Sequence, residues 1–316
     1  MRRQDEQAIP FGDFLDAKFF LDERSLNDSV RQVLVDECHA RGRLSCLDLG
    51  SGTGAMIRRL LRWFPNLDLA ITALDQDPDL LATARRRIVD ELRNADLVVK
   101  DKGSWLRGES IARTVNVEFA CCRIAEFNPP PARYDLITAH AVVDLLDPSA
   151  VRCKLEEWLI PGGYWYASLN YDGGTFLFPS FDDPGFEQEL LDRYDRSMEE
   201  RRVEGTATGG AHSGTRLLAA LATPDWNTVA YGSSDWNLTP LRNTYRDRDS
   251  VCLQAMLGFI RGEGERGALD PARLACWTAT RSRQLAAGQL GIIVHQLDVL
   301  ARFRPSVKAP RRSAED

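Results

Sequence analysis

The sequence predicts an α/β fold built on a doubly wound, parallel sheet. Strand-like and helix-like segments alternate five times over about 120 residues, from Leu44 to Leu169. A glycine-rich turn joins the first of these strands to its helix, as in sheets that bind a ligand at the helix N-terminus. The 316 residues are 44% hydrophobic and 27% charged, which is enough apolar content for the core of one large domain.

Residues 1–43 are predicted to form an N-terminal helical or lid segment. Apolar side chains at helical spacing from Leu26 to Cys38 indicate one helix, which Asn27 or Asp28 begins and Gly42 ends. Asp77-Pro78 and Asp147-Pro148 each place a capping side chain before a proline at the first helical position, so two further helices are expected to begin there. Short apolar runs predict strands at 44–49, 69–74, 115–122, 134–139 and 164–169.

The second half of the chain is less regular. Residues 96–116 lack a clear pattern and are interpreted as an insertion. Helical insertions are expected around 172–222 and 250–287, where they form a cap. The apolar run at 289–303 is interpreted as the last strand. The central domain is therefore predicted to span 44–304, with a disordered tail at 305–316.

Composition excludes several classes of protein. The formal net charge is −6 and no basic stripe is visible, so no nucleic acid partner is expected. No apolar run has the length of a membrane span, and the N-terminus has no signal-peptide core, so neither a membrane partner nor secretion is expected. The seven scattered cysteines are interpreted as reduced core residues of a cytoplasmic protein, and the four histidines lack metal-ligand spacing, so no metal is expected.

The segment Leu47–Gly54, which reads LDLGSGTG, carries the functional interpretation. A G-x-G fragment alone is a weak signal, and with Ala55 it also fits a loose dinucleotide-binding pattern. The acid before the first glycine, together with Asp75 after the second strand, resembles the first motifs of the Rossmann-like, class I S-adenosylmethionine-dependent methyltransferases. The segments 134–137 and 159–163 resemble later motifs of that family. The resemblance covers 44–169 well, and the last strand more loosely.

This resemblance implies a Rossmann-like sheet of seven strands, one of them antiparallel, with S-adenosylmethionine at the carboxyl ends of the strands. Asp75 is expected to accept hydrogen bonds from both ribose hydroxyls, and Gln76 to lie beside the adenine. His140 is expected near the sulfonium. Arg123 departs from the family, which often places an acid there beside the adenine amino group; Glu126 follows three residues later. The remaining expected cofactor-binding residues are Asp48, Gly50, Ser51, Gly52, Thr53, Gly54, Ile124, Ala139 and Arg24.

The acceptor side is less defined by the sequence. His140 is a candidate catalytic base, with a structural histidine at a strand end as the alternative. Tyr171 and Asp172 follow the fifth strand on the ligand-binding edge and are candidate substrate contacts, as is Trp236, for which core packing is the alternative. Arg24 is a candidate partner for the methionine carboxylate, with a surface ion pair as the alternative.

The predicted function is transfer of a methyl group from S-adenosylmethionine to a small-molecule acceptor. The donor is already activated, so proximity and orientation supply much of the rate and the product is S-adenosylhomocysteine. Two alternatives stay open: a degenerate scaffold that binds S-adenosylmethionine, and an NAD-dependent Rossmann oxidoreductase. The sequence does not determine the oligomeric state, the acceptor or the atom that is methylated.

Overall fold

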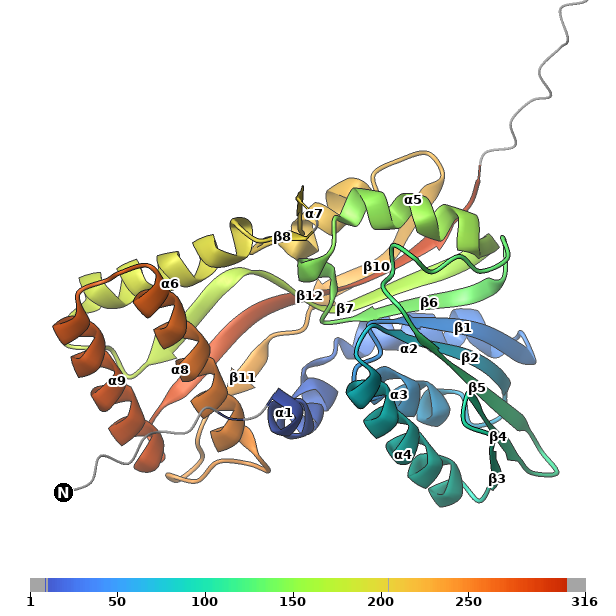
Figure 1. Ribbon diagram of the computed structural model, residues 1–316, viewed down its shortest axis with the longest axis horizontal. Coiled ribbons are helices and arrows are strands. Elements are labelled where there is room, and N and C mark those ends of the chain that lie inside the picture. The colour runs from blue at the N-terminus through green and yellow to red at the C-terminus, as the bar shows by residue number, and fades with distance from the viewer. Residues whose placement is uncertain (1–8, 10, 204, 306–316) are drawn as a thin grey trace, which may run out of the picture.

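A computed structural model describes residues 9, 11–203 and 205–305 of the chain. Except for Pro305, the tail predicted at 305–316 lies outside the described residues. A mixed sheet of ten strands forms the centre of the described structure, in the order β10-β12-β7-β6-β1-β2-β5-β4-β3, with β11 paired to β12 (Figure 1). The strands of this sheet are β1 (Arg43–Leu49), β2 (Asp68–Asp75), β3 (Val98–Asp101), β4 (Trp105–Glu109), β5 (Thr114–Cys121), β6 (Tyr134–His140), β7 (Leu159–Phe178), β10 (Trp226–Ser233), β11 (Trp236–Leu238) and β12 (Gly291–Phe303).

Seven of these strands form the predicted Rossmann-like sheet. β1 pairs in parallel with β2 and β6, β2 with β5, and β6 with β7, whereas β12 is antiparallel to β7 and to β10. The fold class is therefore as predicted, but the sheet is wider than seven strands. The segment at 96–116 forms the hairpin β3–β4, which adds to the free edge of β5 and satisfies its backbone groups. β7 is also much longer than the strand predicted at 164–169.

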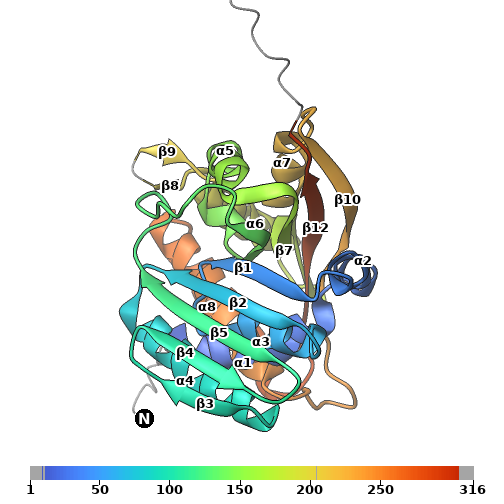
Figure 2. The ribbon, with the colours of Figure 1, turned by 90° about the vertical axis from the view of Figure 1, so that its right-hand side faces the viewer.

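Helices cover both faces of the sheet. α2, α3 and α4 lie on one face and α5 and α7 on the other, each over its own apolar core (Figures 1 and 2). The crossover helices α3 and α4, on the β2 side of β1, lie on one face, and α5, on the β6 side, lies on the other, so the strand ends open into a crevice between β1 and β6. The helices are α1 (Phe11–Ser25), α2 (Asp28–His39), α3 (Ala55–Trp63), α4 (Pro78–Asn94), α5 (Pro148–Trp158), α6 (Pro184–Glu199), α7 (Ser213–Ala220), α8 (Asp249–Arg266) and α9 (Pro271–Ala286), with a 3₁₀ turn η1 (Val143–Leu145).

Several helices begin with the same dipeptide. α4, α5, α6 and α9 each have proline at the first helical position, preceded by an aspartate whose side chain accepts backbone N–H groups of the first turn. Proline has no N–H to leave unpaired there, and the aspartate satisfies donors that the helix itself cannot. The two Asp-Pro starts predicted from sequence, at Asp77 and Asp147, are confirmed.

A third apolar core lies beside the sheet. α6, α8 and α9 pack with α1 around the extended ends of β7, β11 and β12. In Figure 1 this cap is at the left, the sheet is at the right, and α1 lies between them. The cap thus places an N-terminal helix, distant in sequence, against the edge of the sheet where the strands end.

Two predictions made from composition, on membrane spans and on the cysteines, can be compared with the structure. No described helix is long and apolar enough to cross a membrane. All seven cysteines are free thiols, but only Cys38, Cys46 and Cys252 are buried, so the expectation that most belong to the core is wrong. Cys122 is half-buried and the other three are exposed.

Candidate functional site

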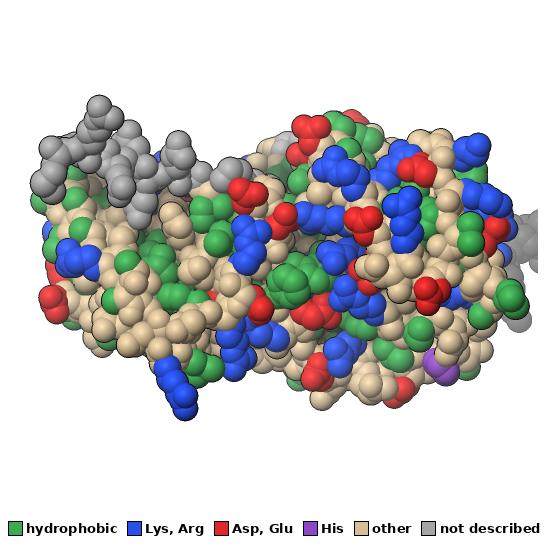
Figure 3. Space-filling model, turned by 90° about the horizontal axis from the view of Figure 1, so that it is seen from below, with side chains coloured by type: hydrophobic (Ala, Val, Ile, Leu, Met, Phe, Trp, Pro, Cys, Tyr) green, Lys and Arg blue, Asp and Glu red, His purple; other side chains and the backbone are tan. Residues whose placement is uncertain are grey.

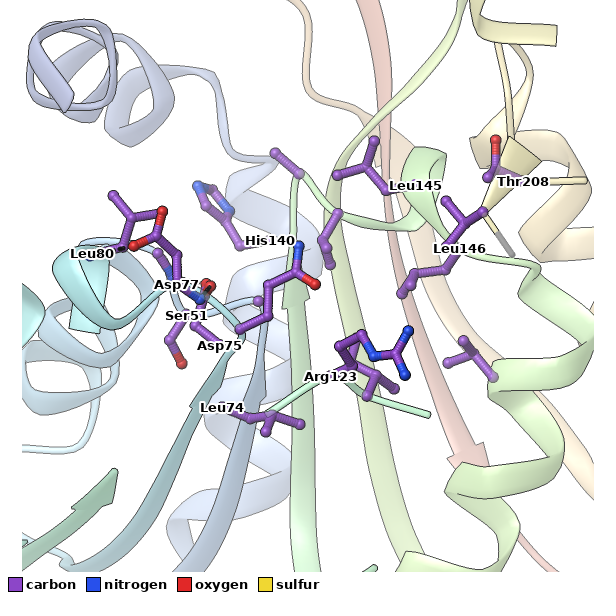
Figure 4. Close-up of a pocket in the computed structure, with 18 of the residues that line it drawn as sticks. Ser51, Leu74, Asp75, Asp77, Leu80, Arg123, His140, Leu145, Leu146 and Thr208 are labelled. Carbon is purple, nitrogen blue, oxygen red and sulfur yellow. Dashed lines mark hydrogen bonds between the residues drawn. The ribbon is translucent and has the colours of Figure 1, made fainter. Parts of the chain in front are cut away.

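A cavity of about 690 Å³ opens at the carboxyl ends of β1, β2, β5 and β6. Its walls come from the loop after each of these strands, from α1, from η1 and the start of α5, and from the short hairpin of β8 (Arg202–Val203) and β9 (Thr206–Ala207). Figure 4 shows Ser51 and Asp75 on one side, His140 near the centre, and Leu146 and Thr208 on the opposite side. This is the edge at which open α/β sheets bind their ligands.

The glycine-rich loop contributes backbone to the cavity wall. Gly50, Gly52 and Gly54 all have positive φ, of 62°, 51° and 78°, which favours glycine. A Cβ on Gly50 would lie 2.8 Å from Val142 Cγ2, so the loop can approach η1 only without a side chain there. Gly50, Ser51, Gly52 and Thr53 line the cavity as expected. Gly54 does not; a Cβ at this position would lie 3.1 Å from the Cβ of Ala84, so Gly54 allows α3 and α4 to pack closely.

Asp75 lies at the end of β2 and faces the cavity. Its Oδ2 accepts a hydrogen bond from the Gly52 N–H at 2.7 Å, and its Oδ1 accepts one from the Asp77 N–H at 2.9 Å. These bonds fix the carboxylate against the glycine loop. Each oxygen keeps a further lone pair, so the carboxylate can accept hydrogen bonds from two adjacent hydroxyl groups.

Asp48 lies in the interior and does not line the cavity. It is 1% exposed, and its Oδ1 accepts a hydrogen bond from Thr138 Oγ1 at 2.7 Å. Burial raises the pKa of Asp48 to about 6, against the opposing effect of the Thr138 bond. Ala139 is likewise buried away from the cavity. The sequence therefore located the motif correctly, but Asp48 and Ala139 support the site from within the sheet.

The loop after β5 forms another part of the wall. Gln76 and Ile124, both expected to bind the cofactor, line the cavity. Arg123 also lines it, and its guanidinium pairs with the Glu126 carboxylate, with 2.5 Å between Nη2 and Oε1. Arg123, the residue that departs from the family pattern, therefore forms an ion pair with Glu126, the acid three residues after it. Lys154 of α5 lies nearby and donates to the Ala125 carbonyl at 3.2 Å.

His140 lines the cavity at the end of β6 and is held on both ring nitrogens. Its Nδ1 lies 2.8 Å from Ser168 Oγ, and its Nε2 lies 3.1 Å from both Asp22 Oδ2 and Arg59 Nη1. Burial, with the positive charge of Arg59, lowers the pKa of His140 to about 4 despite the opposing effect of Asp22. The imidazole is therefore neutral at pH 7.

One face of α1 completes the cavity. Leu15, Lys18 and Asp22 line it, at the i, i+3, i+7 spacing of a single helical face. Lys18 Nζ lies 2.7 Å from Asp22 Oδ2, and both residues are at least nine-tenths buried. Burial alone would raise the pKa of Asp22, but Lys18, His140 and Arg59 together hold it well below its ordinary value. The sequence predicted a helix or lid here but did not identify these side chains.

Besides Asp48, Gly54 and Ala139, four further expected site residues lie outside the cavity wall, among them Arg24 and Trp236. The Arg24 guanidinium pairs with the buried Asp249 carboxylate at 2.5 Å, so Arg24 forms an ion pair outside the cavity wall. Trp236 is buried and donates from Nε1 to Asp22 Oδ1 at 3.1 Å, so it lies behind a cavity residue.

Tyr171 and Asp172 also point elsewhere. The Tyr171 hydroxyl donates to Asp195 Oδ1 of α6 at 2.6 Å, and Asp172 Oδ1 accepts from the N–H of Thr215 near the start of α7 at 2.8 Å. They join β7 to the helices of the second half because β7 continues past the cavity into the cap. A strand predicted to end at Leu169 would have placed them at the cavity edge.

Other cavity residues were missed by sequence reasoning. Leu145 and Leu146 of the η1 region and Thr206 to Thr208 of the β9 segment line the side opposite the glycine loop. No motif marks them, because they reach the cavity through the course of irregular loops. Within the described ranges, no group of three or more histidine, cysteine or acidic side chains is arranged to hold a metal ion.

Comparison with known proteins agrees with this geometry. Residues 47–167 match the methyltransferase domain family. The chain is 27% identical over 188 residues to alpha N-terminal protein methyltransferase 1 of Arabidopsis thaliana, a match that covers 56% of this chain and 60% of the relative. The chain therefore spans less than two thirds of the length of that relative.

Solved structures share the fold. A protein from Bacillus halodurans C-125, provisionally assigned as a methyltransferase, is 12% identical, with a TM-score of 0.50 over 88% of this chain and all of its own. Geranyl diphosphate C-methyltransferase from Streptomyces coelicolor A3(2) is also 12% identical, with a TM-score of 0.44 over 88% of this chain and 79% of its own. At 12% identity, the likeness to the Bacillus protein describes the fold alone.

The fold of the described residues is that of the Rossmann-like methyltransferases. The match over residues 47–167 shows that this part of the chain is a methyltransferase domain.

Proposed function

We propose that the protein transfers a methyl group from S-adenosylmethionine to a small-molecule acceptor. The observation that carries this proposal is Asp75, fixed by two backbone N–H groups at the end of β2 and facing the cavity with lone pairs for two ribose hydroxyls. The glycine loop beside it presents backbone at the N-terminus of α3, where a cofactor can approach without side-chain hindrance.

The remaining cofactor contacts follow from the same orientation. With the ribose at Asp75, the adenine lies toward Gln76 and Ile124, and the sulfonium toward His140. S-adenosylmethionine supplies an activated methyl group, so the protein needs mainly to hold the donor and acceptor in line. His140 is the candidate base, because it is neutral at pH 7 and Asp22 lies 3.1 Å from the nitrogen that would take a proton.

The form of the cavity supports a small acceptor. α1, η1 and the β8–β9 segment line the cavity at the strand ends, and its volume of about 690 Å³ is that of a small-molecule site. On the face drawn in Figure 3, Lys and Arg side chains alternate with Asp and Glu, and the chain carries a net charge of −6. Such a surface offers little attraction to nucleic acid. The Arabidopsis relative, by its name, methylates protein N-termini, and a peptide amine is the competing acceptor class.

One experiment tests transfer and acceptor size together. The protein is incubated with S-adenosylmethionine labelled in the methyl group and with cell extract divided by ultrafiltration into small-molecule and macromolecular fractions. We expect label to move into molecules of the small fraction, and Asp75→Ala to abolish most of that signal. Label confined to the macromolecular fraction would reject the small acceptor. Absence of transfer to either fraction would count against methyl transfer and favour the scaffold alternative.

A further inference from the structure

The amino-acid end of the proposed cofactor requires recognition of two opposite charges. In S-adenosylmethionine and S-adenosylhomocysteine an ammonium and a carboxylate are attached to one carbon atom. Asp75 fixes the ribose on the β2 side of the cavity, so this end of the molecule extends toward His140 on β6 and toward α1, which packs above it. The side chains of α1 that line this region are Leu15, Lys18 and Asp22.

We propose that Lys18 and Asp22, together called the α1 clamp, bind the carboxylate and the ammonium of the methionyl group. This inference rests on the proposed function and assigns a binding role to a helix outside the matched domain of residues 47–167. The two charges of the clamp are adjacent, with 2.7 Å between Lys18 Nζ and Asp22 Oδ2. An adjacent pair of opposite charges is complementary to an amino-acid zwitterion.

Both members of the clamp keep hydrogen-bonding capacity. The Lys18 ammonium has three donors, of which Asp22 takes one. Asp22 accepts from Lys18 on Oδ2 and from Trp236 Nε1 on Oδ1, and its Oδ2 also contacts His140. A carboxylate has about four acceptor positions, so Oδ1 retains one for an ammonium.

The surrounding residues fix the clamp in place. Trp236 of the cap contacts both members: it donates to Asp22, and the Lys18 ammonium lies 5.4 Å from its ring centroid. Arg59, which is fully buried, bonds Glu23 and the Phe19 carbonyl of α1 from below. Preorganised charges lose less entropy on binding, so these contacts favour affinity as well as position.

The other basic side chains nearby do not fit this role. Arg24 is paired with Asp249 outside the cavity, and Arg59 does not line it. Arg123 and Lys154 line the cavity on the side of the β5 loop, where Arg123 is paired with Glu126. Among the described residues, Lys18 is therefore the cation at the His140 end of the cavity.

The test compares ligands with and without the zwitterion. Calorimetry measures S-adenosylhomocysteine and 5′-methylthioadenosine, which keeps the adenosine and the sulfur but lacks the amino-acid group. We expect Lys18→Met to weaken S-adenosylhomocysteine about tenfold or more and to leave 5′-methylthioadenosine within twofold. Lys18→Arg should restore much of the loss, and Arg24→Met, the charge-matched control on the same helix, should change neither affinity.

A second variant removes the problem of an unpaired buried charge. Lys18→Met combined with Asp22→Asn leaves no isolated ion, so it is expected to fold even if Lys18→Met alone does not. It should again weaken only the zwitterionic ligand. Equal losses for both ligands, or no loss for either, would overturn the clamp while wild-type binding of S-adenosylhomocysteine upheld the proposed function. Failure of the wild type to bind S-adenosylhomocysteine would reject the function itself, and the clamp with it.

Discussion

Replacing Asp75 with alanine is expected to weaken binding of S-adenosylhomocysteine by about 1–3 kcal/mol, or roughly ten- to a hundredfold. The variant removes the acceptor for two ribose hydroxyls. It also leaves the N–H groups of Gly52 and Asp77 without this partner, so the glycine loop loses one of its bonds to β2. Isothermal titration calorimetry at one ionic strength measures the difference directly.

Asp79→Ala is the matched control for this prediction. Asp79 lies four residues further along, in the first turn of α4, and has the same charge, but its side chain is exposed and does not line the cavity. Its replacement should leave the affinity unchanged. An Asp75→Ala variant that is folded and binds S-adenosylhomocysteine as tightly as wild type would show that the ribose is held elsewhere.

Replacing His140 with alanine is expected to lower turnover by about 10²-fold, the scale of general base catalysis. For Nε2 to take a proton from the acceptor, Arg59 Nη1, which lies 3.1 Å from it, must give up this contact and keep its bonds to Glu23 and the Phe19 carbonyl. A proton taken at Nε2 is then stabilised by Asp22 Oδ2, which lies 3.1 Å away. Turnover is measured as release of S-adenosylhomocysteine with the acceptor isolated from the labelled fraction.

The pH profile separates a base from a residue that only holds α1. The folded pKa of His140 is lowered to about 4, so the neutral form persists as pH falls and is lost only near that value. Wild-type turnover should therefore stay level from about pH 8 to about pH 5 and decline near pH 4. A decline centred near the ordinary imidazole pKa, or full turnover in His140→Ala, would remove this residue from the mechanism.

The sequence predicted the central fold because its signals are local. Alternating apolar segments, Asp-Pro helix starts at Asp77 and Asp147 and the glycine turn each depend on a few neighbouring residues, and all appear where expected. The hairpin β3–β4 was not predicted, because its strands are short and mostly exposed. Their pairing with the edge of β5 is a tertiary contact that the local pattern does not encode.

The cavity residues likewise fall into those that a local motif predicts and those that tertiary packing brings to the site. Asp75, Gln76, Ile124, His140 and the first four residues of the glycine loop reach the cavity because each follows directly from a strand end. Lys18 and Asp22 arrive through the packing of α1 between cap and sheet, which no motif records. Tyr171 and Asp172 were misplaced because β7 continues into the cap and carries its polar residues past the cavity. Trp236 lies in β11, where it is buried behind Asp22.

The central claim is that the cavity at the end of β1 and β2 is built for S-adenosylmethionine and not for a dinucleotide. Calorimetric titration of the full-length protein with S-adenosylhomocysteine and, separately, with NAD⁺ tests this most directly. We expect S-adenosylhomocysteine to bind with a dissociation constant on the order of micromolar and NAD⁺ to show no measurable binding at the same concentrations. Tight binding of NAD⁺ without binding of S-adenosylhomocysteine would contradict the assignment.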